Sequence, residues 1–263
     1  MAGYFGTRAQ QRLQARVDEL SGWIASTPGA CNSGRSLGCD DLDKFGWRNV
    51  EEIMSRDGVL GFRLLPSQRA GELIEWMTSR GYRIDFWDPF IGDRDNVLRA
   101  ADAILARPLP SDLKISPAPT APTGDCIEAI QALMSESGVS PYAGSMLSGQ
   151  KAPAITAVLV DQSGTAIAVA FGHKPHNAYS RFSDYAYGGA VAVSPTHRGR
   201  GLGRYVNALV AARTLRELGG THFYEFVSSD NASSRRMVEA CALRPCSELI
   251  AAMAVADTEK FTR

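Results

Sequence analysis

The chain has 263 residues, of which 44% are hydrophobic and 21% charged, and its 28 basic residues balance 28 acidic ones. This length suits two compact units, each able to bury a core, whereas a formal net charge of zero offers no field for nucleic acid or an anionic membrane. Because no apolar run approaches the roughly 18 residues of a membrane span and the N-terminus lacks the pattern of a signal peptide, we expect a cytoplasmic protein.

The first 110 residues are predicted to form an α/β unit of their own. Apolar side chains recur at helical spacing between residues 7 and 26, which predicts one amphipathic helix, and the polar residues 30–41 predict a loop. The remaining elements are expected to be strands at 59–65 and 82–87 and helices at 70–79 and 97–105. Pro108 and Pro110 then interrupt the pattern, so that the boundary with the second unit, residues 111–263, is predicted near residue 110.

No catalytic constellation is recognisable in residues 1–110. We interpret this unit as a small domain that packs on the second unit, forms the contact of a homodimer, or closes a substrate cleft. The sequence leaves these three alternatives open.

The second unit alternates strands and helices. Hydrophobic patterns predict strands at 113–115, 154–160, 165–171, 185–193, 221–227 and 249–255, and helices at 125–137, 204–218 and 231–243. Asp125 is placed to cap the first of these helices, and residues 161–164 predict a hairpin turn. The polar connection 172–183 carries His173 and His176, which we expect on the surface, with contact to a substrate as the alternative.

The cysteines predict neither a disulfide framework nor a metal site. Their number is odd, their spacing is uneven, and no Cys-x-x-Cys or Cys/His ligand pattern is present. The five are Cys31, Cys39, Cys126, Cys241 and Cys246. We therefore expect reduced thiols, with the buried ones acting as small hydrophobic groups, and no bound metal.

The most informative segment is Val193–Gly203, which joins a predicted strand to a predicted helix. A strand that ends at a proline and turns through three glycines into a helix leaves backbone N–H groups free at the helix N-terminus, where the helix dipole adds positive potential. Glycine lets phosphate oxygens approach the backbone, and Arg198, Arg200 and Arg204 add charge. The segment therefore predicts a phosphate-binding loop.

The spacing within this loop excludes two common phosphate motifs. A Walker loop needs Gly-x-x-x-x-Gly-Lys-Ser/Thr, and the dinucleotide fingerprint needs a third glycine that the helix lacks. The observed pattern is Arg198-x-x-Gly201-x-Gly203 after a strand ending Val-x-Val-x-Pro. This pattern resembles the acetyl-CoA loop of the GCN5-related N-acetyltransferase (GNAT) superfamily, and an ordinary glycine-rich strand–helix turn is the alternative.

The resemblance extends from about residue 112 to residue 256, because the order of strands, loop and late helix is that of the superfamily. It implies an α/β (α+β) fold in which helices flank a mixed central sheet, with an additional N-terminal α/β domain that is either unrelated or a degenerate second copy. The family's second CoA motif is matched by Asn231, Ser234 and Met237. The chain departs from that motif at Val238, where the family often has tyrosine, and at Ala242-Leu243, which replaces Gly-Phe.

The resemblance also implies a set of residues that bind acetyl-CoA as co-substrate, with no metal. Backbone N–H groups of the loop would hold the pyrophosphate, and the preceding strand would hydrogen-bond pantetheine. The implied set is Val191, Val193, Arg198, Gly199, Arg200, Gly201, Leu202, Gly203, Arg204, Asn231 and Ser234.

The catalytic groups are less clearly marked. An alkyl amine with a pKa of ~10.4 is almost entirely protonated at neutral pH, so attack on a thioester calls for a base or a water relay. Our candidate base is Glu225, a carboxylate within the apolar run 221–227 that shares a strand face with Phe223 and Val227. An exposed position at a sheet edge, without a catalytic role, is the alternative for Glu225, and Asp184, Tyr187 and His197 are further candidates. Because Val238 replaces the usual tyrosine, the leaving thiolate needs another proton donor, for which Tyr224 is the candidate and Tyr205, Cys241 or water are alternatives.

Together these features predict an enzyme that transfers an acetyl group from acetyl-CoA to a primary amine by direct attack. A small-molecule amine, such as an amino acid, amino sugar, polyamine or antibiotic, is favoured over a protein substrate because the neutral chain offers no acidic trough. The alternatives are a longer-chain N-acyltransferase and a CoA-binding regulator without catalysis.

Overall fold

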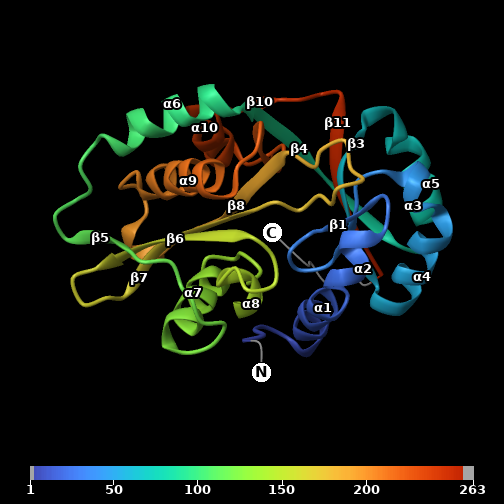
Figure 1. Ribbon diagram of the computed structural model, residues 1–263, viewed down its shortest axis with the longest axis horizontal. Coiled ribbons are helices and arrows are strands. Elements are labelled where there is room, and N and C mark those ends of the chain that lie inside the picture. The colour runs from blue at the N-terminus through green and yellow to red at the C-terminus, as the bar shows by residue number, and fades with distance from the viewer. Residues whose placement is uncertain (1–2, 257–263) are drawn as a thin grey trace.

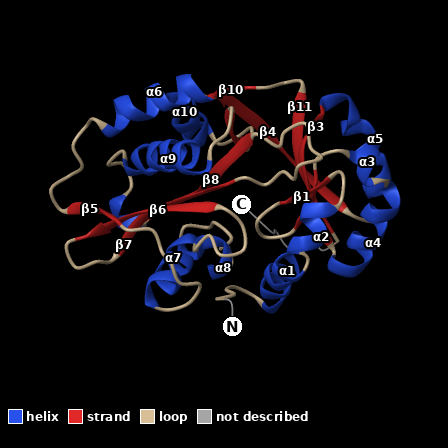
Figure 2. Cartoon of the chain, viewed as in Figure 1, coloured by secondary structure: helices blue, strands red, loops and turns tan. Residues whose placement is uncertain are grey.

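The computed structural model describes residues 3–256, whose strands form one mixed sheet of 11 strands (Figures 1 and 2). The strand order is β1-β2-β3-β11-β4-β9-β8-β7-β6-β5, with β10 beside β4. The strands are β1 Ala30–Asn32, β2 Leu37–Cys39, β3 Val59–Pro66, β4 Arg83–Asp93, β5 Leu113–Ser116, β6 Ala154–Asp161, β7 Ala166–His173, β8 Tyr185–Val193, β9 His222–Val227, β10 Arg244–Pro245 and β11 Leu249–Val255. The predicted α/β class with a mixed central sheet is therefore confirmed.

Helices cover both faces of this sheet (Figure 2). They are α1 Arg8–Glu19, α2 Ser21–Ser26, α3 Leu42–Phe45, α4 Trp47–Asp57, α5 Ala70–Thr78, α6 Arg94–Leu105, α7 Asp125–Glu136, α8 Gly144–Leu147, α9 Leu202–Arg213 and α10 Ala232–Ala240, with a π-helical turn at Thr214–Leu218. None of the helices within residues 3–256 is long and apolar enough to cross a membrane.

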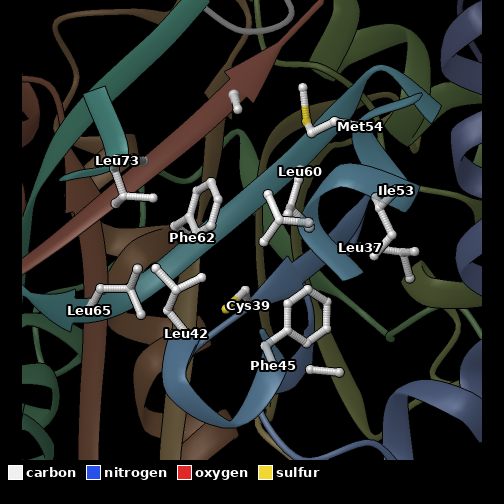
Figure 3. Close-up of a cluster of buried hydrophobic side chains, with 14 of the residues drawn as sticks. Leu37, Cys39, Leu42, Phe45, Ile53, Met54, Leu60, Phe62, Leu65 and Leu73 are labelled. Carbon is white, nitrogen blue, oxygen red and sulfur yellow. The ribbon is translucent and has the colours of Figure 1, made fainter. Parts of the chain in front are cut away.

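The N-terminal elements enclose a core of their own. Side chains from β2, β3, α3, α4 and α5 meet in the cluster of Figure 3, where Phe62 and Leu65 of β3 lie over Cys39 of β2 and Leu42 of α3. Leu64 adopts a φ of 52°, which interrupts the alternation of β3. As a result, Leu65 faces this core together with Phe62, whereas Leu64 packs on the other side of the strand.

Two predictions for this region need correction. The predicted helix 7–26 is divided into α1 and α2 at Leu20, whose ψ of 11° departs from helical geometry. The predicted loop 30–41 contains β1 and β2, which pair with each other, and β2 continues in parallel with β3. Strands of three residues are too short to show a periodic pattern in the sequence. These segments become strands because β3 provides a tertiary partner.

The C-terminal elements form two helical layers on the sheet. Helices α6, α9 and α10 lie along one face, and α7 and α8 lie along the other (Figure 1). The hairpin predicted at 161–164 joins β6 to β7 in antiparallel register. Asp125 is the first residue of α7 rather than its cap, which is Gly124 with no side-chain hydrogen bond, so the predicted capping role is wrong.

Strand β4 connects the two parts of the sheet. Its residues 83–87 pair with β11, and its residues 88–93 pair with β9. Strand β11, which comes last in the chain, therefore lies between β3 and β4, among the N-terminal elements (Figure 1). Because hydrogen bonding continues across both parts, the division near residue 110 stays a prediction.

Candidate active site

The site begins where two central strands separate. Strand β8 pairs in parallel with β9 only from Tyr185 to Tyr187, and no further β8–β9 pair follows within the described chain. A bulge in β8 accompanies the separation, because its register against β7 shifts and Ala190 adopts a φ of 51°. The opening leaves backbone groups of β8 without ladder partners on this side and creates room for a ligand between the strands.

The glycine loop follows directly from β8. Gly199 and Gly201 have φ of 79° and 78°, conformations that L side chains rarely adopt, and a Cβ at either position would meet no atom within 4 Å. Gly201 is the N-cap of α9 and no side chain caps the helix. The first backbone N–H groups of α9, on Leu202, Gly203 and Arg204, therefore have no side-chain cap, and the space beside the preceding glycines is open, as an anion site requires. These residues fit the phosphates of a CoA co-substrate.

The three arginines of the loop are exposed but differ in their contacts. Arg200 forms a two-pronged ion pair with Asp112, at 2.7 and 2.9 Å. The Nε of Arg198 donates to the carbonyl of Val193 at 3.4 Å, which ties the loop back to the strand. Arg204 lies in the first turn of α9.

A cavity of about 420 Å³ occupies the opening between β8 and β9. This volume lies within the range of small-molecule sites, roughly 300–1,000 Å³. One wall carries three predicted residues, Val191, Asn231 and Ser234. The opposite wall comes from the N-terminal elements and β11, including Arg63 and Met253. Both parts of the chain therefore form one cavity.

Asn231 also has a structural task. Its side chain accepts a hydrogen bond from the backbone N–H of Ser234 at 3.0 Å and so caps α10. The two predicted residues are thus held together by the helix start, at the edge of the cavity. Val193 and Gly203 also meet beside the loop, where a Cβ on Gly203 would lie 3.7 Å from the Val193 side chain.

Glu225 lies on the same face of β9 as Phe223 and Val227, as predicted, and α9 and α10 cover this face, so the alternative of an exposed edge position is wrong. It is 3% exposed, and its Oε1 accepts a hydrogen bond from Nδ2 of Asn207 at 2.8 Å. Burial raises the pKa of Glu225 to about 7, although the Asn207 hydrogen bond lowers it. Glu225 does not line the cavity, which lies beyond the other face of β9.

Tyr224 belongs to that other face. Its hydroxyl accepts a hydrogen bond from Nη1 of Arg63 at 3.2 Å and lies 2.9 Å from Nε2 of His176. The Nδ1 of His176 is 2.5 Å from Oδ2 of Asp40. Because arginine can only donate, the tyrosine proton points to Nε2, and the proton on Nδ1 points to Asp40. We call Arg63, Tyr224, His176 and Asp40 the buried relay.

The buried relay is neutral at its centre. Burial lowers the pKa of His176, although hydrogen bonding to Asp40 opposes this effect, and burial raises the pKa of Tyr224. Cys31 adjoins the relay. Its Sγ, a carboxylate oxygen of Asp40 and a ring nitrogen of His176 all lie within 4.8 Å of one another. Burial raises the pKa of Cys31 well above its ordinary value, so this thiol is protonated.

His173, the last residue of β7, and His176, in the connection after β7, are both buried, so the expected surface position is wrong. His173 is fully buried and His176 is 8% exposed. Burial lowers the pKa of His173 well below its ordinary value, and Arg63 lowers it further. No local signal announces the relay, because Asp40 lies 136 residues from its partner.

The comparisons with known proteins follow this geometry. Residues 130–242 match the family model of the acetyltransferase (GNAT) family. None of the curated proteins compared matches the chain. The fold is similar to that of a GCN5-related N-acetyltransferase from Kribbella flavida, with 16% sequence identity, coverage of 89% of this chain and 80% of the other, and a TM-score of 0.55.

Two further solved structures are similar over nearly the whole chain. A Drosophila protein solved by a structural genomics consortium shares 14% identity, with coverage of 94% and 89% and a TM-score of 0.59. A tandem GNAT protein from the clavulanic acid biosynthesis pathway shares 15% identity, with coverage of 93% and 89% and a TM-score of 0.53. At these identities the likeness is one of fold.

Proposed function

The chain contains a domain of the acetyltransferase (GNAT) family at residues 130–242, and from this premise we propose that it is an enzyme that transfers an acetyl group from acetyl-CoA to a primary amine of a small molecule. The observation that carries the proposal is the cavity at the separation of β8 and β9, next to an uncapped helix N-terminus with open space above its glycines. Acetyl-CoA supplies the thioester carbonyl that the amine would attack.

Binding would use the backbone more than the side chains. We propose that the N–H groups from Gly199 to Arg204 hold the pyrophosphate, with Arg198 and Arg204 adding charge at the surface. Val191 and Val193, beside the bulge, would pair with the pantetheine amides through their backbone groups. A free N–H of β8 in the opening would also stabilise negative charge on the carbonyl oxygen during attack.

The attacking amine must lose a proton, and two routes are available. Glu225 is the base predicted from the sequence, and its pKa of about 7 suits the task, although its carboxylate lies on the covered face of β9. The buried relay offers another route on the cavity side. Tyr224 is fully buried and does not itself line the cavity, so the amine proton would reach its hydroxyl through an intervening water, while the hydroxyl passes its own proton to Nε2 of His176 and Asp40 stabilises the resulting imidazolium.

For the proton donor to the leaving thiolate we propose water or the predicted Tyr224, whose hydroxyl is fully buried outside the cavity lining and already hydrogen-bonded to Arg63 and His176. Val238, at the family's tyrosine position, is completely buried between α9 and α10 and offers no proton. Burial raises the pKa of Cys241 to about 12, which makes this thiol a weak acid for the purpose.

The test is calorimetric titration with acetyl-CoA, CoA and a long-chain acyl-CoA, followed by thiol release with a panel of amines. Saturable binding that is strongest for acetyl-CoA, with turnover of at least one amine, is the expected result. Preference for the long chain would move the assignment to N-acylation. Tight binding without turnover of any amine would favour a regulator, and no binding would refute the proposal.

A further inference from the structure

The part of the cavity lining that comes from the N-terminal elements is positively charged. Among the described residues that line the cavity, the only ionised side chains are Arg35 and Arg63, and no carboxylate lines it. We infer that the acceptor, within the proposed acetyltransferase function on which this inference rests, is an amine that also carries a carboxylate, and that Arg35 and Arg63 bind this group. An α-amino acid is the simplest such molecule.

Arg63 is a buried cation without a direct countercharge. It is 5% exposed, and no described carboxylate forms an ion pair with it. It donates three hydrogen bonds, to Oγ and O of Ser33, at 3.3 and 3.4 Å, and to the hydroxyl of Tyr224. Burial of a charge is costly unless it is paired, and only three of its five N–H donors are used, so Arg63 is prepared for an anion.

The groups around Arg63 do not cancel its charge. Its guanidinium lies 4.2 Å from the ring centre of Tyr187, which also lines the cavity, and burial raises the pKa of this phenol, so it stays neutral. The carboxylate of Asp40 belongs to the same relay, but His176 and Tyr224 stand between it and Arg63. The charge of Arg63 therefore remains available at the cavity.

Arg35 adds a second guanidinium from the turn between β1 and β2. It lies 4.4 Å from the ring centre of Tyr142 and donates to the hydroxyl of the same residue at 3.1 Å. Stacking fixes the plane of the guanidinium and leaves its other N–H edges for a carboxylate, which this fork matches with two hydrogen bonds. No described carboxylate forms an ion pair with Arg35.

The backbone beneath Arg63 is shaped to hold it. Ser33 sits between two glycines, because a Cβ on Gly38 or Gly61 would lie 2.4 or 2.6 Å from its Oγ. The absence of these side chains lets Ser33 approach Arg63 and fix its Nε and Nη2. Such preorganisation reduces the entropy that anion binding would cost.

The charge also discriminates among amines. Two guanidinium groups repel the additional ammonium groups of a polyamine and find no anionic group on a simple amino sugar, whereas a carboxylate compensates their charge. The positive potential further lowers the pKa of an ammonium in the cavity, which favours the neutral amine that attacks.

The test compares matched ligands on the intact chain. Thiol release from acetyl-CoA is measured with the common L-amino acids and with their carboxamides, together with O-phosphoethanolamine as a phosphate-bearing amine. Binding of N-acetyl-L-amino acids and of their amides is measured by calorimetry, with and without CoA. Arg35→Met and Arg63→Lys are compared with Arg80→Met, whose arginine stacks on Trp76 at 4.1 Å outside the cavity.

We expect at least one acid to exceed its carboxamide by about tenfold or more in kcat/KM. This ratio should collapse in Arg35→Met and Arg63→Lys, with acetyl-CoA affinity intact, and persist in Arg80→Met. Arg35 is partly exposed, so its variant remains informative if Arg63→Lys fails to fold.

Several outcomes overturn the inference. Equal use of acids and amides, a ratio that survives Arg35→Met, or binding of no carboxylate ligand would each do so, and preference for O-phosphoethanolamine would reassign the wall to phosphate. A loss of acetyl-CoA affinity in the arginine variants as large as their loss of amino-acid use would show that these arginines bind the co-substrate. The calorimetric arm without CoA keeps the result separate from the proposed function, because acid-selective binding would support the carboxylate site even where acetyl-CoA fails to bind.

Discussion

Glu225 makes the pH dependence of stability predictable. The carboxylate is buried beneath α9 with one hydrogen bond, from Nδ2 of Asn207, while the Oδ1 of Asn207 is buried without a partner. Burial raises the pKa of Glu225 from 4.5 to about 7. The folded protein therefore holds a proton that the unfolded chain releases between these two pH values.

The sign and size of the effect follow from proton linkage. Stability from this group is fully present below pH 4.5 and is lost as the pH rises through 7, at about 1.4 kcal/mol per pH unit, for a total of about 3 kcal/mol. Glu225→Gln removes the titration, and its amide N–H offers a donor to the unpartnered Oδ1 of Asn207. We expect the free energy of unfolding of the variant, relative to that of the natural chain, to be about 2 kcal/mol higher at pH 8 than at pH 5.

The assay is urea unfolding of both chains at pH 5 and pH 8, with Glu75→Gln as the control because Glu75 is exposed on α5. The control should change stability equally at the two pH values. An equal shift of Glu225→Gln at both, or destabilisation that grows with pH, would refute the argument from burial.

The remaining predictions test the loop, the late helix and the relay. Gly201→Val should weaken acetyl-CoA binding by at least about tenfold in calorimetry, because the loss of charge-assisted hydrogen bonds costs roughly 1.5–3 kcal/mol each, whereas Gly219→Val, at a φ of 76° and with the same open surroundings, should leave it intact. Ala242→Gly should raise stability in urea by up to about 1 kcal/mol, since Ala242 has a φ of 63°, and Ala240→Gly within α10 should lower it. Tyr224→Phe should lower the free energy of unfolding by roughly 1–3 kcal/mol, because it leaves two buried partners unpaired. The control Tyr179→Phe, at an exposed tyrosine, should leave it nearly unchanged. For the proton route, Glu225→Gln should remove the acidic limb of the kcat/KM profile if Glu225 is the base, and an unchanged limb that is lost in His176→Gln would transfer the role to the relay.

The elements that the sequence predicted are those with local signals. Apolar periodicity predicted β5, β6, β7, β8, β9 and β11 and helices α7, α9 and α10, whereas the short α8 and β10 were not predicted. The glycine loop is recognisable because its glycines and arginines are adjacent in the chain. The family's glycine at the end of the late helix is replaced by Ala242, yet the backbone keeps the left-handed conformation there, with a φ of 63°, although the residue type gives no sign of it.

The parts that were missed depend on contacts between distant segments. Burial of Glu225 was predictable because its neighbours in one strand are apolar, but its distance from the cavity was not, since the cavity forms on the other face. His176 looks polar and exposed in its own segment and becomes buried only because Asp40 and Tyr224 reach it from elsewhere. Arg63 is likewise a charged residue within an apolar run, the signal that singles out Glu225, but its partners Ser33 and Tyr224 come from distant segments.

The path of the chain explains why both walls of the cavity keep their spacing. Strand β11 follows the second CoA motif in sequence but pairs with β3, the strand that carries Arg63. Strand β4 pairs with β11 at one end and with β9, the strand of Tyr224, at the other. A shift of the cationic wall relative to the loop would therefore break ladder hydrogen bonds on both sides of β4. The sheet thus makes the distance between the proposed acceptor carboxylate and the thioester a rigid property of the fold, and an acceptor whose amine and carboxylate are separated by the wrong length would bind without reacting.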